Sequence, residues 1–586
     1  MTALAERVTS WRKDSPTDLI PTAALTILGV LFAFESRTPL LVVGNTFVLT
    51  SVEVLIVLAL ATWVVTLLRS RRRPSAPLMV IVPAISWIAA LLASTATAPA
   101  PIALPLRFTA RMVAGVALAW ACYDCVVTAR RPVWIACGLA LGGGLVAVLG
   151  LAEALNLPVI VTWLGNFKVA PTRVGDILRI SSTLSYATIA SMVLELTFPL
   201  ALGWFITAKH SALKAAAGVI GLLDLIVLVL TLSRAGVIAL GAALAVVVLA
   251  ALRSEQRRIA YAGAGAMATL GILAGLSIVY NPEVGLRLTS ESDQTWFKDS
   301  IAVPGQLTAR PGEVLVIPVT VTNASVKTWG GDASHPFSLG YHLYGSDHEL
   351  VTYDGARTPL GADLPPDGTV QLQAKVVVPD KPDTYDIQWD VVQNGLAWFS
   401  WKGAATPSTA LVVSGAAANG PAIVYVPPPQ SILTLPVPGR LELWSAGLTM
   451  LESRPLLGVG PDNFRWQFGP YEHISQWNVD IHANNLYVEL LADTGIIGFL
   501  AFMWLAWRII RQSTGGLWTR RSGDLWVWRV AVLASLTAWF VHGLLDYFFE
   551  FTPTYTAFWM IVGLALGLAQ LEVNERLDAN ANADRV

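Results

Sequence analysis

Long apolar runs separated by short polar segments dominate the hydropathy pattern of this chain. A helix needs about 20 apolar residues to cross a hydrocarbon core of roughly 30 Å, so each such run is a candidate membrane span. The pattern predicts twelve transmembrane helices. They lie near residues 19–35, 52–68, 78–97, 106–127, 134–154, 183–207, 215–232, 235–252, 259–280, 486–507, 525–546 and 554–571.

One of these stretches, residues 215–252, contains 38 residues between two basic clusters. That length fits two crossings rather than one, so the chain is expected to leave and return. The turn falls at Leu232-Ser233-Arg234-Ala235-Gly236, which places Arg234 at the outer membrane face. An arginine that only anchors a helix end by snorkelling is the simpler interpretation of this residue.

Between Tyr280 and His482 no run is long or apolar enough to span a bilayer. Residues 314–321, 370–378 and 385–392 instead alternate β-branched and polar positions, with turn signals such as Pro365-Pro366-Asp367-Gly368 between them. This pattern predicts an antiparallel β-sandwich of immunoglobulin type over about 295–415. Its tryptophans are candidates for a sugar-stacking platform, but a core position is favoured for all four, namely Trp329, Trp389, Trp398 and Trp401. A linker rich in Ala, Gly and Pro follows at 416–436.

The expected fold is therefore a polytopic all-α membrane protein of about 12 transmembrane helices with an inserted extracytoplasmic β-sandwich. Four regions follow along the chain. They are an N-terminal transmembrane bundle (1–280), the β-insertion with its linker (281–436), an interfacial segment with site elements (437–485), and C-terminal transmembrane helices with a tail (486–586).

Composition supports a membrane protein. Of 586 residues 54% are hydrophobic and only 13% charged, whereas about 25% are charged in ordinary soluble domains; the mean hydropathy is +0.58. The three cysteines lie in or beside apolar runs, so Cys122-x-x-Cys125 is expected to pack in a helix rather than bind a metal.

The net charge of −1 hides a segregation of basic residues into alternate loops. Because Lys and Arg are retained on the cytoplasmic side, both termini are predicted inside and the β-insertion outside a cytoplasmic (inner) membrane. No nucleic-acid partner is expected. One predicted outer loop is an exception to this retention of basic residues inside, because it contains Lys168, Arg173 and Arg179. Positive charge at this place suggests a function. The inner clusters are Arg7, Arg12, Lys13; Arg69, Arg71, Arg72, Arg73; Arg130, Arg131; Lys209, Lys214; Arg253, Arg257, Arg258; Arg508, Arg511, Arg520, Arg521.

Three features after the linker carry candidate chemistry. Residues 440–452 have apolar positions at helical spacing (Leu441, Trp444, Leu448, Leu451), which predicts an amphipathic helix at the membrane interface that begins at Arg440. Gly458-Val-Gly460-Pro-Asp-Asn-Phe predicts a tight loop without the residues of a phosphate loop. His482 precedes the tenth predicted helix and lies at its outer mouth.

These residues carry a resemblance. Ser233-Arg234-Ala-Gly, Arg440 with Trp444, the 455–464 loop, His482 with Leu486, and Gly495-Ile-Ile-Gly498 resemble the O-antigen ligase and Wzy-type polymerase superfamily in order and spacing. The resemblance is loose over 20–280 and closer over 440–571, and the β-insertion is outside it. It implies a GT-C-like membrane glycosyltransferase that uses an undecaprenyl-diphosphate-linked glycan and needs no metal or other cofactor. Arg234, Ser233 and Arg440 then correspond to the diphosphate-binding residues and His482 to the catalytic histidine.

Departures from the family pattern concern the acceptor side. Ala483 stands directly after the histidine where the family usually has Asn or Ser, and the amides follow at Asn484 and Asn485. Arg179 is similar to the family's arginine before its sixth helix. Asp493, Asp546 and His542 are candidates for orienting a partner, but a plain hydrogen bond inside the bundle is favoured for each. Glu195 and Asp224 are predicted to pair inside the bundle.

The chemistry of these residue types agrees with that expectation. Two guanidinium groups can neutralise a departing diphosphate, and an imidazole with a pKa of about 6.5 can accept the proton of an acceptor hydroxyl. In-line attack predicts inversion. A ligase that transfers a finished glycan to a lipid or wall acceptor is the first hypothesis, with a polysaccharide polymerase and a protein O-oligosaccharyltransferase as alternatives. Across these hypotheses the acceptor is a glycan, a lipid or a protein. A transporter or sensor with an external receptor domain is the hypothesis from another class, but the motif charges lie at one face rather than at mid-membrane. The enzyme hypotheses all require Arg234, Arg440 and His482 at one level beside a lipid-sized opening.

Overall fold

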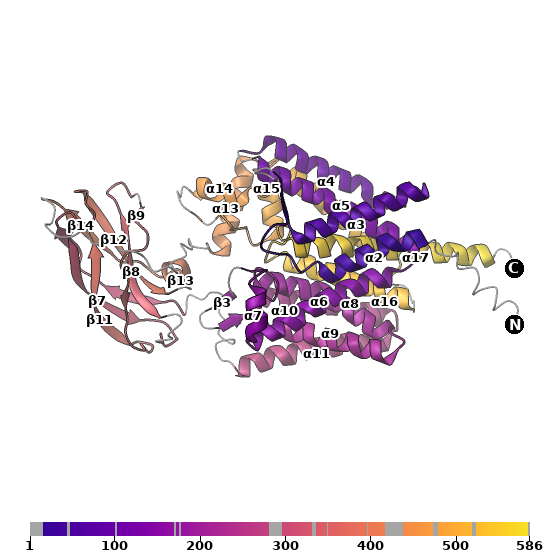
Figure 1. Ribbon diagram of the computed structural model, residues 1–586, viewed down its shortest axis with the longest axis horizontal. Coiled ribbons are helices and arrows are strands. Elements are labelled where there is room, and N and C mark those ends of the chain that lie inside the picture. Colours follow the sequence, from indigo (N-terminus) through magenta and orange to yellow (C-terminus); the bar gives the residue numbers. More distant parts are fainter. Residues whose placement is uncertain are drawn as a thin grey trace.

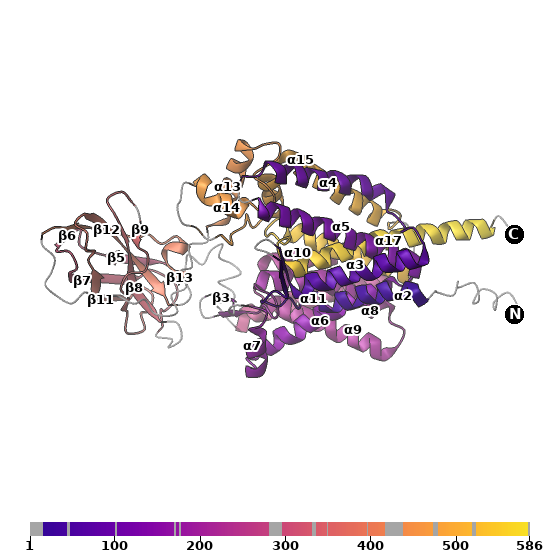
Figure 2. The same cartoon turned by 45° about the horizontal axis from the view of Figure 1, so that its top comes forward.

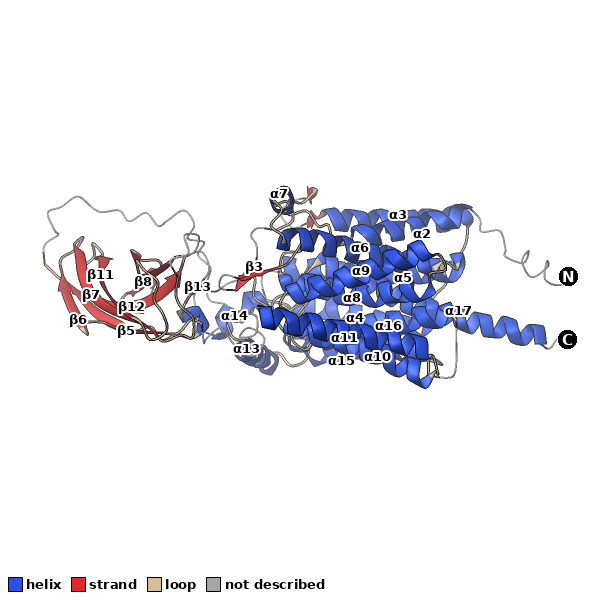
Figure 3. Cartoon of the chain, turned by 90° about the horizontal axis from the view of Figure 1, so that it is seen from below, coloured by secondary structure: helices blue, strands red, loops and turns tan. Residues whose placement is uncertain are grey.

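The computed structural model describes a helical bundle and, beyond one end of it, a separate body of β-strands (Figures 1 and 3). We call residues 296–415 the β-domain and the bundle end nearest to it the β-domain end. The described residues are 16–43, 47–99, 102–168, 172–174, 177–280, 296–330, 336–348, 350–394, 397–415, 438–472, 477, 479–518 and 523–583.

Eleven of the described helices are long and apolar enough to cross a membrane. The first predicted span is shorter than expected, because α2 ends at Leu31 and has 16 residues, or 13 in its apolar part Leu19–Leu31. It nevertheless packs in the bundle beside α3 and α6. The bundle comprises α2 (Pro16–Leu31), α3 (Ser51–Ser70), α4 (Leu78–Thr97), α5 (Ala103–Ala129), α6 (Pro132–Ala154), α8 (Ala187–Thr207), α9 (Ser211–Leu230), α10 (Arg234–Arg253), α11 (Arg257–Tyr280), α15 (Leu486–Thr514), α16 (Asp524–His542) and α17 (Thr552–Ala583).

The predicted hairpin at residues 215–252 is confirmed as α9 and α10. The start of α2 and the C-terminal end of α17 lie at the bundle end remote from the β-domain (Figure 1). Because successive helices alternate in direction, the connections that carry basic clusters, such as α3–α4 and α10–α11, lie at that same end. This agrees with the alternation of charge along the sequence. Arg7, Arg12, Lys13, Arg520 and Arg521 lie outside the described residues.

Two helix pairs fix the part of the bundle that matters for the site. Helix α4 lies beside α15, and α5 lies beside α17 (Figure 2). The second pair is in close contact, since a Cβ on Gly563 would lie 2.4 Å from the Ala119 carbonyl oxygen. Residues at the β-domain ends of α5 and α17 are therefore held in a fixed relation.

Short elements cover the β-domain end of the bundle: a hairpin of β1 (Leu41–Val43) and β2 (Phe47–Leu49), α7 (Pro158–Leu164), and a hairpin of β3 (Thr172–Val174) and β4 (Ile177–Arg179). Lys168, one of the basic residues that break the charge rule, is buried here. It forms an ion pair with Glu153 and donates to Ser181 Oγ at 2.8 Å. This contact gives Lys168 a structural role in holding the loop on α6.

The β-domain consists of two sheets around one core. One sheet has the order β10-β8-β12-β14-β6, with β13 beside β12 and β9 beside β8, and the other has the order β11-β7-β5. Strands β14 and β6 pair in parallel, so the expectation of a wholly antiparallel sandwich is wrong at that edge. The strands are β5 (Asp299–Ala302), β6 (Gln306–Ala309), β7 (Val314–Asn323), β8 (Phe337–Tyr344), β9 (Leu350–Thr352), β10 (Thr358–Pro359), β11 (Thr369–Val377), β12 (Thr384–Gln393), β13 (Ala397–Trp398) and β14 (Ser408–Val413).

The three strand segments predicted from alternation correspond to β7, β11 and β12. Their inward residues form the core, as in the pairs Val319–Leu372 and Trp389–Tyr341. Three of the four tryptophans, Trp329, Trp389 and Trp398, are buried as the sequence favoured, and Trp401 is half-buried. The immunoglobulin type remains a prediction. The predicted linker at 416–436 lies outside the described residues.

Candidate active site

Two short helices, α13 (Arg440–Ser453) and α14 (Phe464–Glu472), cover α15 at the β-domain end. The predicted helix is confirmed as α13. Leu441 and Leu448, two of its predicted apolar positions, are exposed, and its location at the membrane interface remains a prediction. Its contacts with the rest of the protein are made by other, mostly smaller residues. The half-buried Trp444 donates from Nε1 to the carbonyl of Ala483 at 2.9 Å and so fixes the backbone beside His482. The buried face consists of Leu443, Ala446, Gly447 and Met450.

Helix α15 is broken near its start, at Gly495, where the backbone has φ 63° and ψ −171°. The sequence predicted residues 493–498 to continue the helix, but a glycine can adopt this left-handed conformation at little cost. Residues 455–460 supply the hydrogen bonds that the break removes. Ile496 and Ile497 donate to the carbonyls of Pro455 and Leu456 at 2.9 and 3.2 Å, and Val459 and Gly460 donate to Ala492 and Asp493 at 2.9 Å each.

Asp493, immediately before this break, holds the loop in place. Its carboxylate accepts backbone hydrogen bonds from Asp462 at 2.7 Å and from Phe464 at 2.9 Å. Both bonds are buried, and they fix the start of α14. The candidate role of Asp493 in orienting a partner therefore takes the form of positioning the loop that carries Asp462.

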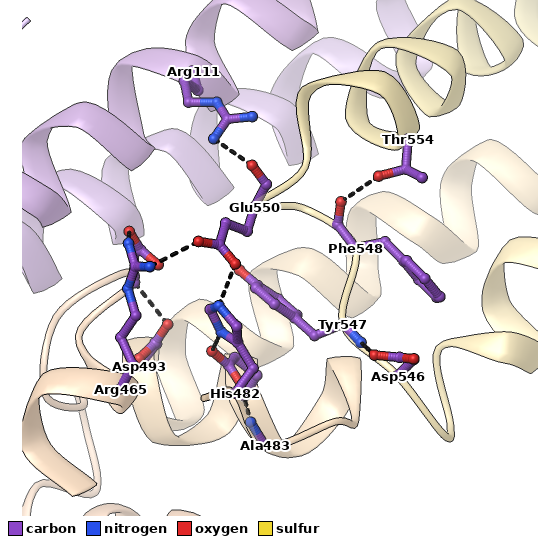
Figure 4. Close-up of polar contacts among 12 residues, drawn as sticks. Arg111, Arg465, His482, Ala483, Asp493, Asp546, Tyr547, Phe548, Glu550 and Thr554 are labelled. Carbon is purple, nitrogen blue, oxygen red and sulfur yellow. Dashed lines mark hydrogen bonds and ion pairs between the residues drawn. The ribbon is translucent and has the colours of Figure 1, made fainter. Parts of the chain in front are cut away.

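His482 lies between two carboxylates just before α15 (Figure 4). Its Nδ1 is 2.6 Å from Glu489 Oε1, and its Nε2 contacts Glu550 Oε2. The other oxygen of Glu489 accepts from the Ala483 backbone at 2.6 Å. Glu489 is fully buried, whereas the Glu550 side chain is 24% exposed. The imidazole is thus fixed from the interior side and reaches accessible space through Glu550.

The two carboxylates determine the charge of the imidazole. Burial alone would lower the pKa of His482, but the charges of Glu550 and Glu489 and their hydrogen bonds outweigh it, so that pKa is raised well above its usual value. Burial likewise favours a neutral Glu550, yet His482 and Arg465 lower the pKa of its carboxyl to about 2. At neutral pH the resting arrangement is an imidazolium that donates on both sides. The free lone pair expected of a histidine base is absent here, and Glu550 is the acceptor that faces outward.

Arginines complete the surroundings of Glu550. Arg465 donates to Glu550 Oε1 at 2.7 Å and to Asp462 Oδ2 at 2.8 Å, while Arg111 donates to the Glu550 backbone carbonyl at 2.6 Å (Figure 4). Burial raises the pKa of Asp462 to about 6, although Arg465 opposes this. A cavity of about 180 Å³ opens beside these groups.

Sequence reasoning missed Glu489, Glu550, Arg465 and Arg111 as parts of the site. Arg111 could have been selected, because it is a charged residue inside an apolar run and such residues are usually functional. Glu550 lies in a short loop nearly free of basic residues.

The predicted arginines lie elsewhere at the same end of the bundle. Arg234 is half-buried and begins α10, and Ser233 caps that helix by accepting from the Gly236 amide at 3.1 Å. Arg179 donates from Nε to the Thr231 carbonyl at 2.9 Å, so it joins the same turn. Arg234, Ser233 and Arg179 therefore form one local group.

A second histidine–carboxylate pair lies inside the bundle. His542 Nδ1 is 2.9 Å from Glu195 Oε2, which confirms that Glu195 is paired. The charges of Asp546 and of the exposed Arg440 both act on His542. Asp224 is different: its carboxylate has no hydrogen-bond partner among the described residues, and the expected pairing is wrong. Its helix, α9, offers mostly apolar neighbours.

The two asparagines after His482 are arranged differently from the expectation for acceptor contacts. Asn485 caps α15 by accepting from Tyr487 at 2.9 Å and Val488 at 3.1 Å, and it donates to the Leu544 carbonyl at 2.9 Å. Asn484 has a left-handed backbone with φ 47°. The amide of Asn485 is therefore occupied by backbone groups.

Comparison with known families bears on this region. Residues 430–503 match the O-antigen ligase family, Wzy_C. This segment is similar to the O-antigen ligase domain. The predicted resemblance is thereby confirmed. The matched segment includes α13, α14, His482, Glu489 and Asp493, whereas Arg234, Arg111 and Glu550 lie outside it.

No curated protein matches the chain. Among solved structures it is similar to "Pseudomonas fluorescens alkylpurine DNA glycosylase AlkC bound to DNA containing an abasic site analog", with 9% identity, a TM-score of 0.14, and coverage of 59% of this chain and 100% of that one. At this score the similarity carries no argument about fold or function. In the described part of the chain no group of three His, Cys, Asp or Glu residues is placed to hold a metal ion.

Proposed function

We propose that this protein is a membrane glycosyltransferase of O-antigen ligase type. It transfers a glycan from an undecaprenyl-diphosphate-linked donor to an acceptor hydroxyl at the outer face of the cytoplasmic membrane, with both termini inside. The observation that carries the proposal is the arrangement of His482 between Glu489 and Glu550, in and beside the segment that matches the O-antigen ligase family. A buried carboxylate that orients a histidine toward an accessible group is a recurrent acid–base unit of transferases and hydrolases.

The reaction needs one proton acceptor and one stabilised leaving group. The acceptor oxygen attacks the anomeric carbon, the bond from that carbon to the diphosphate oxygen breaks, and the acceptor proton passes to the Glu550–His482 pair. A bound diphosphate is negatively charged, so it raises the proton affinity of this pair when the donor arrives. Attack opposite the diphosphate inverts the anomeric carbon.

The leaving diphosphate requires positive charge outside this pair. Arg234 and Arg440 supply it in the proposal, with Ser233 holding the turn of Arg234. A guanidinium group binds phosphate oxygens in a bidentate manner and stays charged at any relevant pH. Partial exclusion of water strengthens the contacts as charge develops on the diphosphate.

The test is transfer by purified protein in lipid nanodiscs. A synthetic undecaprenyl-diphosphate oligosaccharide is incubated with candidate glycan, lipid and protein acceptors, and glycosylated product and released lipid diphosphate are measured. H482Q is expected to abolish transfer, and R234A and R440A to raise the KM for the donor. H210Q and R69A are matched controls because both residues are exposed and lie near the α8–α9 and α3–α4 connections, at the bundle end remote from the β-domain. Transfer by H482Q at the wild-type rate contradicts the proposal, as does a wild-type protein that releases no lipid diphosphate.

The same assay separates the related activities. Products with repeat ladders on the lipid carrier indicate a polymerase, single transfer indicates a ligase, and transfer to a peptide indicates a protein glycosyltransferase.

We further propose that the β-domain positions or selects the acceptor. Deletion of residues 295–415 should then raise the KM for the acceptor and leave that for the donor unchanged; no change in either parameter contradicts this role.

A further inference from the structure

The cavity beside Glu550 has no role in the chemistry described so far. It has a volume of about 180 Å³, which is comparable to a single sugar ring. We propose that this cavity is a monosaccharide subsite that seats the acceptor sugar whose hydroxyl reacts. The inference rests on the proposed function. Its charged lining consists of Glu35, Arg107, Arg111, Asp462, Arg465 and Glu550.

Position relative to His482 is the first argument. Glu550 lines the cavity and uses its two carboxylate oxygens in opposite directions. Oε2 contacts His482 Nε2, and Oε1 accepts from Arg465 on the cavity side (Figure 4). A hydroxyl that hydrogen-bonds Glu550 from the cavity is therefore one residue away from the imidazole. The sugar in the cavity is then the nucleophile, which makes it the acceptor rather than the donor.

Charge balance is the second argument. The lining contains three guanidinium groups and three carboxyl groups, so it lacks the positive excess that a diphosphate requires. Alternating charged donors and acceptors suit a neutral polyol, because each sugar hydroxyl both donates and accepts. Phe108 and Phe551 add an apolar wall against which the C–H face of a sugar ring can pack.

The experiment fills the cavity without changing a charge. Leu104 lines it from the first turn of α5, whereas Leu106 in the same turn is 44% exposed and lies outside the lining. L104W and L106W thus form a matched pair. Binding of free glucose, galactose, mannose and N-acetylglucosamine to purified protein is measured by saturation-transfer NMR. At least one sugar is expected to bind the wild type and L106W, with affinity for L104W weaker by at least about tenfold.

Transfer kinetics identify which sugar occupies the cavity. L104W should raise the KM for the acceptor and leave that for the lipid-linked donor unchanged, and D462N, which preserves the cavity volume, should raise the acceptor KM about tenfold. Equal binding and kinetics in L104W and L106W overturn the subsite, as does binding of none of the four sugars by the wild type. A rise in the donor KM instead overturns the assignment to the acceptor. Sugar binding without any transfer would refute the proposed function alone, so the two failures are distinguishable.

Discussion

Replacement of Glu489 by glutamine tests the role of the buried carboxylate. Glu489 accepts two hydrogen bonds at 2.6 Å, one from the Ala483 amide and one from the His482 ring. A glutamine oxygen can replace only one of these acceptors, and its NH₂ group then faces the other donor. The Ala483 amide cannot lose its proton, so the imidazole must give up the proton on Nδ1. The variant therefore keeps the shape of the site but lacks the charge that holds the imidazolium.

The cost follows from the contacts that are lost. Breaking a buried pair by neutralising one partner costs about 3–5 kcal/mol. If this loss raises the activation free energy by the same amount, kcat falls by roughly two to four powers of ten, since each 1.36 kcal/mol changes the rate tenfold. Transfer to a saturating acceptor measures kcat. E442Q on the exposed face of α13 is the control for the same chemical change. A rate for E489Q within threefold of the wild type would refute the reasoning.

The pH dependence of stability gives an independent check with a defined sign. The pKa of His482 is raised in the folded protein, so its contribution is complete below the unfolded value of about 6.5 and is lost as pH rises through the folded pKa. E489Q removes part of that contribution. The difference in thermal unfolding temperature between wild type and E489Q should therefore be largest near about pH 6 and should shrink as pH rises. A difference that is independent of pH contradicts the assignment of the imidazolium.

Three further substitutions test the scaffold by thermal unfolding. D493N keeps only one acceptor for two buried backbone amides, so it should lower the free energy of unfolding by about 1–3 kcal/mol. It should also increase hydrogen exchange at residues 462–464, and unchanged exchange contradicts the role of Asp493 in holding the loop. G495A should lower the free energy of unfolding by at least about 1–2 kcal/mol for the left-handed backbone alone. G241A, whose Cβ would have nothing within 4 Å, should leave that free energy unchanged or raise it. Equal effects of the two variants would argue against the break. D224L should raise the unfolding temperature, because it replaces a buried carboxyl without a described partner by an apolar side chain, and a lower temperature would indicate a partner.

Much of the fold could be predicted from the hydropathy pattern. Long apolar runs between charged clusters identified the helices because a membrane allows few other solutions, and the length of residues 215–252 was enough to indicate the α9–α10 hairpin. The strands β7 and β11 followed from period-two alternation, since one face of each is buried and the other is exposed or half-buried. The break in α15 was not predicted, because a glycine inside an apolar run is common in membrane helices.

The candidate site was only partly predictable. His482 could be selected because it lies just before a helix and belongs to the set of residues that resembles the O-antigen ligase superfamily. Its partners could not, since Glu550 is 68 residues away along the chain and Arg111 reaches the Glu550 carbonyl across 439. Such contacts depend on how α5 and α17 pack, which no local spacing encodes. Arg234 and Arg440 were located at the expected end of the bundle, and their binding of diphosphate remains a prediction.

The break at Gly495 separates the part of α15 that must keep the site geometry fixed from the part that can adjust its tilt to the bilayer. The turn before Gly495, which carries Asp493, and Ile496 and Ile497 just after it are hydrogen-bonded to residues 455–460, while the longer remainder of α15 lies beside α4. A helix that meets a thinner or thicker bilayer adjusts its tilt. Here such a tilt can be absorbed at one glycine, so the distances around His482 should be preserved. We therefore expect transfer rates to vary little between nanodiscs whose lipids differ in acyl-chain length.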